Sequence, residues 1–310
     1  MNAAITDDER TARAELSWLA EPGDRLLGAL VRANGAAAAM ALIRAGRLPN
    51  DTGLAEADDA QRAMSRWHTA LRRVPPRSDV MRVLDCRFRL VCPGDTEWPA
   101  GLDGLGHTAP VALWVTGHSD VRFSCLRSVA VTGSRAATAY GSYLASEFGA
   151  SLGARGLTVI AGGSFGVDAS AHRGALGADG TTIAVTAGGI DVPYPAAHAD
   201  LFGAIAAQGA IVSEAPPGTM PGRLRFQARN RVIAALATGT VIVETGTHGG
   251  AMTAARHARD LGRPVMAVPG PVTSDLSARC NDLIRCGHAV LVTSASDVMD
   301  TLTAANCPAG

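Results

Sequence analysis

Residues 129–135 read Val-Ala-Val-Thr-Gly-Ser-Arg, a short apolar run that ends in a glycine turn. Four apolar residues follow at i, i+4 spacing: Tyr140, Leu144, Phe148 and Leu152. The run is typical of a buried strand, and the later spacing puts one apolar stripe on a helix. This stretch therefore predicts a strand that leads directly into a helix.

The same strand–helix unit recurs to the end of the chain. Continuous apolar strands that alternate with helices are typical of a parallel sheet covered on both faces, with right-handed crossovers. We therefore predict an α/β fold with a Rossmann-like, doubly wound and mainly parallel sheet. The predicted strands are Val129–Thr132, Thr158–Ala161, Thr182–Thr186, Ala210–Ser213, Thr240–Val243, Pro264–Val268 and Ala289–Val292.

The first 75 residues have a different character. They are rich in Ala, Leu and Arg with helical spacing, are broken by Gly35 and Gly46, and contain no strand-like run. Residues 74–78, Val-Pro-Pro-Arg-Ser, are typical of a linker. We expect a small all-helical domain over residues 1–75, an extended Rossmann-like domain over 76–302 and a tail over 303–310.

The composition narrows the function classes. No apolar run reaches the roughly 18 to 20 residues of a membrane span, and the N-terminus lacks the apolar segment of a signal peptide. The six cysteines form no C-x-x-C pair, so we expect reduced thiols, no metal site and a cytoplasmic protein. These cysteines are Cys86, Cys92, Cys125, Cys280, Cys286 and Cys307.

All 28 basic residues are Arg, since the chain contains no Lys. This excludes a Walker A loop and a lysine Schiff base. Because the net charge is zero, any phosphate-binding surface must be a local patch. One patch is visible: Arg223, Arg225, Arg229 and Arg231 lie within nine residues that contain no acid.

Four glycine-rich loops follow predicted strands, and ligands of parallel sheets bind at that edge. Glycine lets backbone approach a ligand closely, and a helix N-terminus offers free N–H groups to an anion. We expect the loops to form a cradle for several phosphates, although glycine is also favoured at any tight turn. They are Gly133-Ser134-Arg135, Gly162–Gly166, Gly188-Gly189 and Thr245–Gly250, the last with His248 as a further possible ligand contact.

The segment from Arg225 to Leu236 predicts a helix whose buried stripe is Val232, Ile233 and Leu236. Arg229 lies on the same face one turn earlier. We expect Phe226 to stack on a base while Arg229 and Arg231 hold phosphates, which is single-strand binding chemistry. The alternative is a solvated basic helix start with Phe226 as a hydrophobic staple.

An enzyme is less consistent with the sequence. The G-x-G-x-x-G spacing of dinucleotide sites is absent, so no cofactor is expected. Asp168 and His172 lie one helical turn apart, but no Ser occupies a nucleophile elbow. We expect Asp168 to cap or brace the helix and His172 to be the polar partner of its carboxylate. We expect no residue to be catalytic.

Seven ordered segments between about residues 90 and 300 resemble motifs of the DNA-processing protein A (DprA/Smf) family. The chain departs from the family pattern at Phe165, Gln227 and Gly249, and no winged-helix domain is expected after Leu302. The seven segments are Gly94–Pro99, Val131–Arg135, Ala161–His172, Phe226–Ala234, Val241–Ala254, Ala267–Pro271 and Ser277–Ile284.

The resemblance implies a homodimer that binds single-stranded DNA, protects it and loads the RecA recombinase, in natural transformation and recombination. It also implies a small helical domain of helix-hairpin-helix or SAM-like type at the N-terminus. The alternative is a nucleotide-binding or phosphoribohydrolase-type enzyme with Glu244 at its site. The expected DNA-binding residues are Gly133, Ser134, Arg135, Gly162, Gly163, Arg225, Phe226, Arg229, Asn230, Arg231, Gly249 and Gly250.

Overall fold

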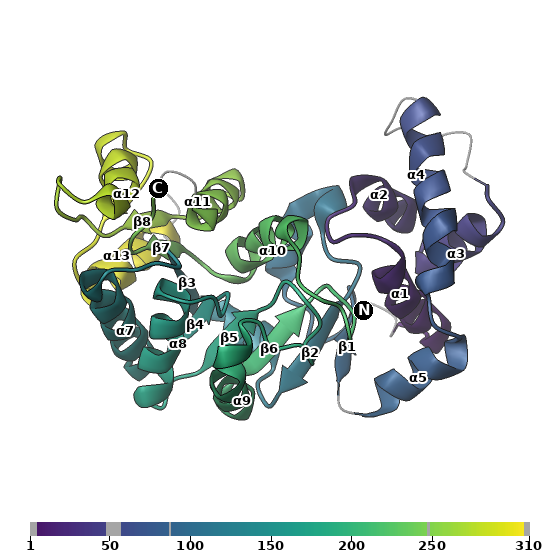
Figure 1. The fold of residues 1–310 in the computed structure, drawn as a ribbon, viewed down its shortest axis with the longest axis horizontal. Coiled ribbons are helices and arrows are strands. Elements are labelled where there is room, and N and C mark those ends of the chain that lie inside the picture. The colour runs from purple at the N-terminus through teal and green to yellow at the C-terminus, as the bar shows by residue number, and fades with distance from the viewer. Residues whose placement is uncertain (1–4, 48–56, 87, 247–248, 307–310) are drawn as a thin grey trace.

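The computed structural model describes residues 5–47, 57–86, 88–246 and 249–306. Helices form its N-terminal part, and a nine-stranded sheet with helices on both faces forms the rest (Figure 1). This confirms the predicted α/β, mainly parallel sheet preceded by N-terminal helices. His248 and Cys307 lie outside the described residues, as does the side chain of Cys86.

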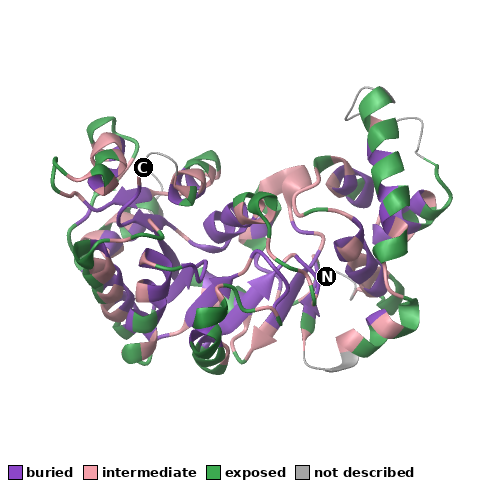
Figure 2. Ribbon diagram, in the orientation of Figure 1, coloured by how far each residue is buried: buried purple, intermediate pink, exposed green. Residues whose placement is uncertain are grey.

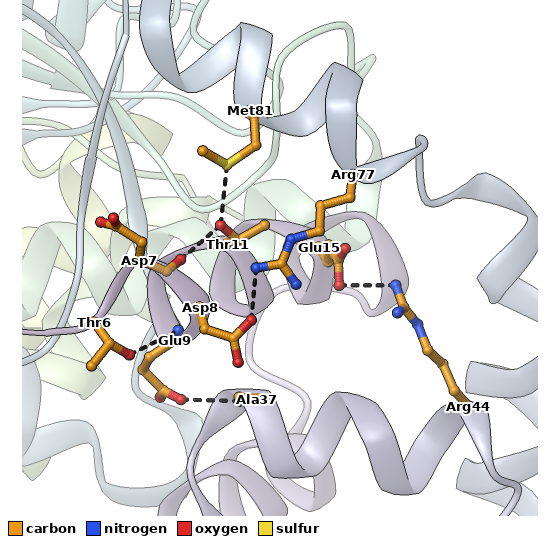
Figure 3. A network of polar contacts seen from close by, with 10 residues as sticks. All are labelled: Thr6, Asp7, Asp8, Glu9, Thr11, Glu15, Ala37, Arg44, Arg77 and Met81. Carbon is orange, nitrogen blue, oxygen red and sulfur yellow. Dashed lines mark hydrogen bonds and ion pairs between the residues drawn. The ribbon is translucent and has the colours of Figure 1, made fainter.

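In the described residues five α-helices precede the first strand, and apolar side chains centred on Leu16, Ile43 and Trp67 form a separate core among the first four of them. Polar contacts fix their ends. Thr6 caps the first helix, and Glu9 accepts a bond from the N–H group of Ala37 (3.0 Å) at the start of the third (Figure 3). Glu9 also accepts a bond from the N–H group of Ala36 (2.8 Å). The helices are α1 (Asp7–Leu19), α2 (Arg25–Asn34), α3 (Ala36–Arg44), α4 (Ala57–Ala70) and α5 (Arg77–Cys86).

The sheet has the strand order β1-β2-β6-β5-β4-β3-β7-β8-β9. The seven predicted strands are all present and pair in parallel; they are β3 (Ser128–Thr132), β4 (Thr158–Ala161), β5 (Thr182–Val185), β6 (Ala210–Ser213), β7 (Thr240–Ile242), β8 (Val265–Ala267) and β9 (Val290–Leu291). Two strands were not predicted. β1 (Arg89–Val91) and β2 (Leu113–Gly117) add an antiparallel edge through pairing of β2 with β6.

Helices cover both faces of the sheet, and the strands β3 to β8 between them are buried, whereas β9 at one edge is exposed (Figure 2). Along β3, Val129 and Val131 pack toward one layer, and Ala130 packs toward the other. The first layer contains α7 (Ala139–Ala154), α8 (Val167–Gly177), α9 (Ala199–Gln208) and α13 (Ala295–Asn306). The second contains α6 (Val121–Leu126), α10 (Arg223–Leu236), α11 (Gly250–Asp260) and α12 (Asp275–Arg285), with 3₁₀ turns at Leu71–Arg73, Ala100–Thr108 and Ala196–His198 elsewhere in the chain.

The direction of winding reverses beside β3. The chain adds β4, β5 and β6 on one side of β3 and then returns to place β7 on its other side. The loops that leave the adjacent strands β3 and β7 therefore lead to helices on opposite faces of the sheet, α7 and α11. In doubly wound sheets such a switch point opens a crevice for ligands.

The N-terminal helices are tied to the sheet domain by an ion pair. Arg10 donates to both carboxylate oxygens of Asp95, at 2.9 Å and 2.6 Å, and to the carbonyl of Leu90. Within the described residues no single helix is both long and apolar enough to cross a membrane; only α2 and α3 taken together pass by length and composition, and they are bent by 116°. Cys92, Cys125, Cys280 and Cys286 are free thiols.

Candidate nucleic-acid interface

A cleft of about 730 Å³ lies at this switch point, between the loops after β3 and β7 and the first turns of α10. The N-termini of α10 and α11 both reach it, and helix N-termini favour anions. The residues that line it include Gly133, Ser134, Arg135, Ser164, Asp168, Tyr194, Arg223, Phe226, Gln227, Arg229, Asn230, Gly249 and Gly250.

Arg229 lies at the floor of the cleft. The predicted stripe of Val232, Ile233 and Leu236 is buried and holds α10 against the sheet. Arg229 is 6% exposed, and its Nη1 donates to the carbonyl oxygen of Val185 at 2.7 Å. A Cβ atom at Gly162 would lie 1.7 Å from that nitrogen, so the guanidinium depends on a glycine there.

The charge of Arg229 has no ion-pair partner among the described residues, and its buried Nε has no hydrogen-bond partner. Asp168, whose charge acts on Arg229, is engaged elsewhere: it accepts bonds from Thr132 Oγ1 (2.9 Å) and from the N–H of Ser164 (3.3 Å). Burial lowers the pKa of Arg229, and Asp168 partly opposes that shift. A buried cation without a counter-ion is costly, so the floor of the cleft is suited to an anion.

Aromatic rings line the cleft above Arg229. The Arg135 guanidinium lies 4.7 Å from the centroid of the Phe226 ring, and the centroid of the Tyr194 ring lies 5.6 Å from it. Tyr194 is 49% exposed and was not predicted as a site residue. Its position in the loop after the predicted strand at 182–186 was the available signal. Cations beside accessible or half-buried rings suit a ligand with both phosphates and bases.

Only part of the predicted glycine cradle lines this cleft. The loops at Gly133–Arg135 and Gly249-Gly250 do, and Asn230 joins them by donating to the carbonyl of Gly250 at 3.1 Å. Gly162 and Gly163 instead pack beneath it, against Arg229 and Phe202, and the loop contributes only Ser164 to the lining. Gly188 and Gly189 pack against the backbone of residues 216–219.

Two of the expected arginines lie outside the cleft. Arg231 forms a buried bidentate ion pair with Glu214, at 2.6 Å and 2.7 Å, on the far side of α10. Arg225 forms a bidentate pair with Glu21 in the loop between α1 and α2, at 2.7 Å and 2.8 Å. Arg223, which has no ion pair among the described residues, lines the cleft instead.

The expected contact between Asp168 and His172 is not present. His172 is fully buried and lies 2.7 Å from Thr182 Oγ1, whose own hydrogen bonds to the carbonyl of Val159. His172 Nδ1 must therefore carry the proton and donate. Burial lowers the pKa of His172 to about 3, so the ring is neutral.

Glu244 faces the start of α7 and is absent from the residues that line the cleft. Its carboxylate accepts bonds from the N–H (2.9 Å) and Oγ1 (2.6 Å) of Thr138. The described residues contain no group of three or more His, Cys, Asp or Glu that could hold a metal ion. The cleft therefore presents cations, rings and backbone rather than an acid–base pair.

The chain is similar to proteins that have been named for DNA processing. The family model of DNA recombination-mediator protein A matches residues 89–303. A DNA processing protein DprA of Mycobacterium tuberculosis is 42% identical over 96% of this chain and 76% of its own length. Protein Smf of Escherichia coli is 37% identical over 62% of this chain and 51% of its own length.

Two solved structures share the fold. DNA processing protein A from Streptococcus pneumoniae is 29% identical with a TM-score of 0.76, over 96% of this chain and 98% of that one. DNA processing protein A from Helicobacter pylori, described with a single-stranded-DNA binding mode, is 26% identical with a TM-score of 0.62, over 70% and 96%. The family match and these likenesses agree with the seven motif segments. This chain belongs to the DNA recombination-mediator protein A (DprA/Smf) family of DNA-processing proteins.

Proposed function

We propose that this protein binds single-stranded DNA in the switch-point cleft with little base preference. The observation that carries the proposal is Arg229, a buried guanidinium without an ion pair among the described residues, which lies 5.8 Å from the centroid of the half-buried ring of Phe226. A phosphate would supply the missing negative charge, and a base would stack on the ring. The single-stranded-DNA binding described for the Helicobacter pylori protein supports this choice of ligand.

The proposed contacts with the DNA strand differ in the part of the nucleotide that they hold. Arg135, Arg223 and Arg229 hold phosphates, because each lines the cleft and lacks an ion pair among the described residues. Phe226 and Tyr194 hold bases. The remaining contacts are the backbone and small side chains of Gly133, Ser134, Asn230, Gly249 and Gly250.

The wider role we propose is that of a recombination mediator in DNA recombination and natural transformation. It protects incoming single strands and loads the RecA recombinase onto them, as a cytoplasmic homodimer. The family membership supports this role. Light scattering at micromolar concentration should give about twice the chain mass, and a monomer would contradict the dimer.

We further propose that the N-terminal domain ends at residue 75. Its core contains Leu16, Ile43 and Trp67, all on α1–α4. After this point, Val80 of α5 packs in a different cluster, which joins Trp114 of the sheet to Ala14 of α1. Helix α5 therefore packs between the two domains.

A titration tests the proposed ligand. A labelled oligonucleotide should bind in its single-stranded form and lose most of that affinity when its complement is annealed, because duplex bases cannot reach the rings. Equal affinity for the single strand and the blunt duplex would contradict the proposal.

We also propose that the protein is not an enzyme. The carboxylate of Glu244 is engaged by Thr138, and the neutral ring of His172 is enclosed by the core. Incubation with nucleoside monophosphates should release no free base. Base release that is abolished by Glu244→Gln would instead support the phosphoribohydrolase alternative.

A further inference from the structure

A second, larger hollow of about 1220 Å³ lies between the N-terminal helices and α10. We call it the interdomain groove. One wall comes from α1, α2 and α4 with the turns beside them, and the other comes from α10 and the segment before it. In Figure 1, α10 lies between the C-terminal elements and the N-terminal helices, so the groove and the switch-point cleft flank the same helix.

The acids of the groove are already engaged. Glu21 forms both of its bonds with Arg225. Asp24 accepts bonds from the first N–H groups of α2, at Leu26 and Leu27, and from Trp67 Nε1 at 3.0 Å. Glu21 is thereby paired, and the charge of Asp24 lies near only one further arginine of the groove, Arg66, at 4.0 Å.

Three arginines of the groove therefore remain available. Arg25 and Arg73 are exposed and have no ion pair among the described residues, and Arg66 approaches Asp24 only at 4.0 Å. Apolar surface accompanies them: Leu224, 71% exposed, lines one wall, and the half-buried ring of Trp18 lines the other. Guanidinium groups beside apolar surface suit a flexible anion that also carries bases.

The groove and the cleft adjoin each other at the first turns of α10. Gln227 lines both hollows. The residues just before Gln227 point to different hollows. Arg223 and Phe226 line the cleft, while Leu224 and Arg225 line the groove. A single strand that leaves the Phe226 ring needs to pass only this one helical turn to enter the groove.

We propose that the interdomain groove is a second subsite for the same single strand, in which Arg25, Arg66 and Arg73 contact its phosphates. This inference rests on the proposed function. The N-terminal helices then take part in binding directly, and the Arg225–Glu21 pair holds the two walls of the groove together. The contribution of this subsite depends on strand length, because a short strand fills the cleft alone.

The test compares oligothymidylates of about 6 and about 16 nucleotides, within the usual range of single-strand site sizes. The test variant of the full chain is Arg25→Ala/Arg66→Ala/Arg73→Ala. The control is Arg32→Ala/Arg47→Ala/Arg62→Ala, which removes three exposed arginines of the same N-terminal part that do not line the groove. Both variants lose three positive charges, so any change in binding that comes only from the net charge of the protein should be the same in both.

The test variant should bind the short strand as the wild type does and the long strand more weakly. Its log–log salt slope on the long strand should be shallower by about 2, at roughly 0.7 per phosphate. The control should keep the wild-type slope. Equal behaviour of the two variants at both lengths would overturn the proposal and leave the groove for an acidic protein partner.

A direct readout comes from Trp18, which lines the groove. The long strand should quench the intrinsic fluorescence of the wild type more than the short one, and Trp18→Phe should remove the difference. Quenching without length dependence would also overturn the subsite. Failure of the wild type to bind either strand would instead overturn the proposed function itself.

Discussion

A Cβ atom added at Gly162 would lie 1.7 Å from Nη1 of Arg229. The glycine at the end of β4 thus holds open the space that a guanidinium from α10 occupies, and the guanidinium fills it with a hydrogen bond to Val185. The two residues are 67 positions apart in the sequence, and the place of the arginine depends on the glycine. The glycine of the loop serves an arginine, not a ligand.

The first prediction follows from this contact. Gly162→Ala should displace Arg229 and lower the free energy of unfolding by about 1 to 3 kcal/mol, the usual cost of overpacking. Urea denaturation measures it. The control is Gly203→Ala, since Gly203 lies in α9 with open space around it, and alanine there should stabilise by up to about 1 kcal/mol. Equal stability of Gly162→Ala and wild type would contradict the packing.

The ion pair between Arg231 and Glu214 gives the second prediction. Arg231→Met leaves a carboxylate buried without a partner and should cost about 3 to 5 kcal/mol of stability. The double variant Arg231→Met/Glu214→Leu should recover most of that loss and bind single strands with the wild-type salt slope. A shallower slope in the double variant would show that Arg231 contacts DNA.

The third prediction concerns pH. The pKa of His172 is about 3 in the fold and ordinarily 6.5, so the unfolded chain takes up the proton first. Stability should fall as pH decreases from about 6.5 toward 3, by up to about 1.4 kcal/mol per pH unit from this residue.

Denaturation of wild type and His172→Gln between pH 8 and pH 4 checks this contribution. The variant should be less stable near pH 8, because it disturbs the buried bond to Thr182, but its stability should decline less steeply below pH 6.5. Parallel pH profiles for the two proteins would mean that His172 is not buried in its neutral form.

Phe226 gives the fourth prediction. Phe226→Ala removes a stacking ring and should weaken single-strand binding by roughly 1 to 3 kcal/mol per base, with an unchanged salt slope. Tyr194→Phe keeps the ring and should bind as the wild type does. Unchanged affinity in Phe226→Ala would mean that the ring only staples the start of α10.

Much of the fold could be predicted from the sequence, because parallel strands buried on both faces are continuous apolar runs such as Thr158–Ala161. The antiparallel edge could not. β1 has only three residues, and β2 gains its place by pairing with β6, which begins 93 positions after the end of β2. Such a distant pairing leaves no local periodicity.

The candidate site was predictable in location rather than in detail. Arg229 and Arg231 are two positions apart, so a helix turns them about 200° away from each other and only one can face the cleft. Arg225 shares the stripe of Arg229, yet its partner Glu21 lies 204 positions away. Helical spacing gives the direction of a side chain but not the partner that tertiary structure brings to it.

The most direct test of the account is a single-strand titration of Arg229→Met over a range of salt concentrations. Loss of the bond to Val185 costs about 1 to 3 kcal/mol, and removal of an unpaired buried charge offsets that cost, so the variant should stay folded. We expect weaker binding and a salt slope shallower by about 0.7, the share of one phosphate. A folded Arg229→Met protein with wild-type affinity and slope would contradict the claim that this buried guanidinium binds the DNA backbone.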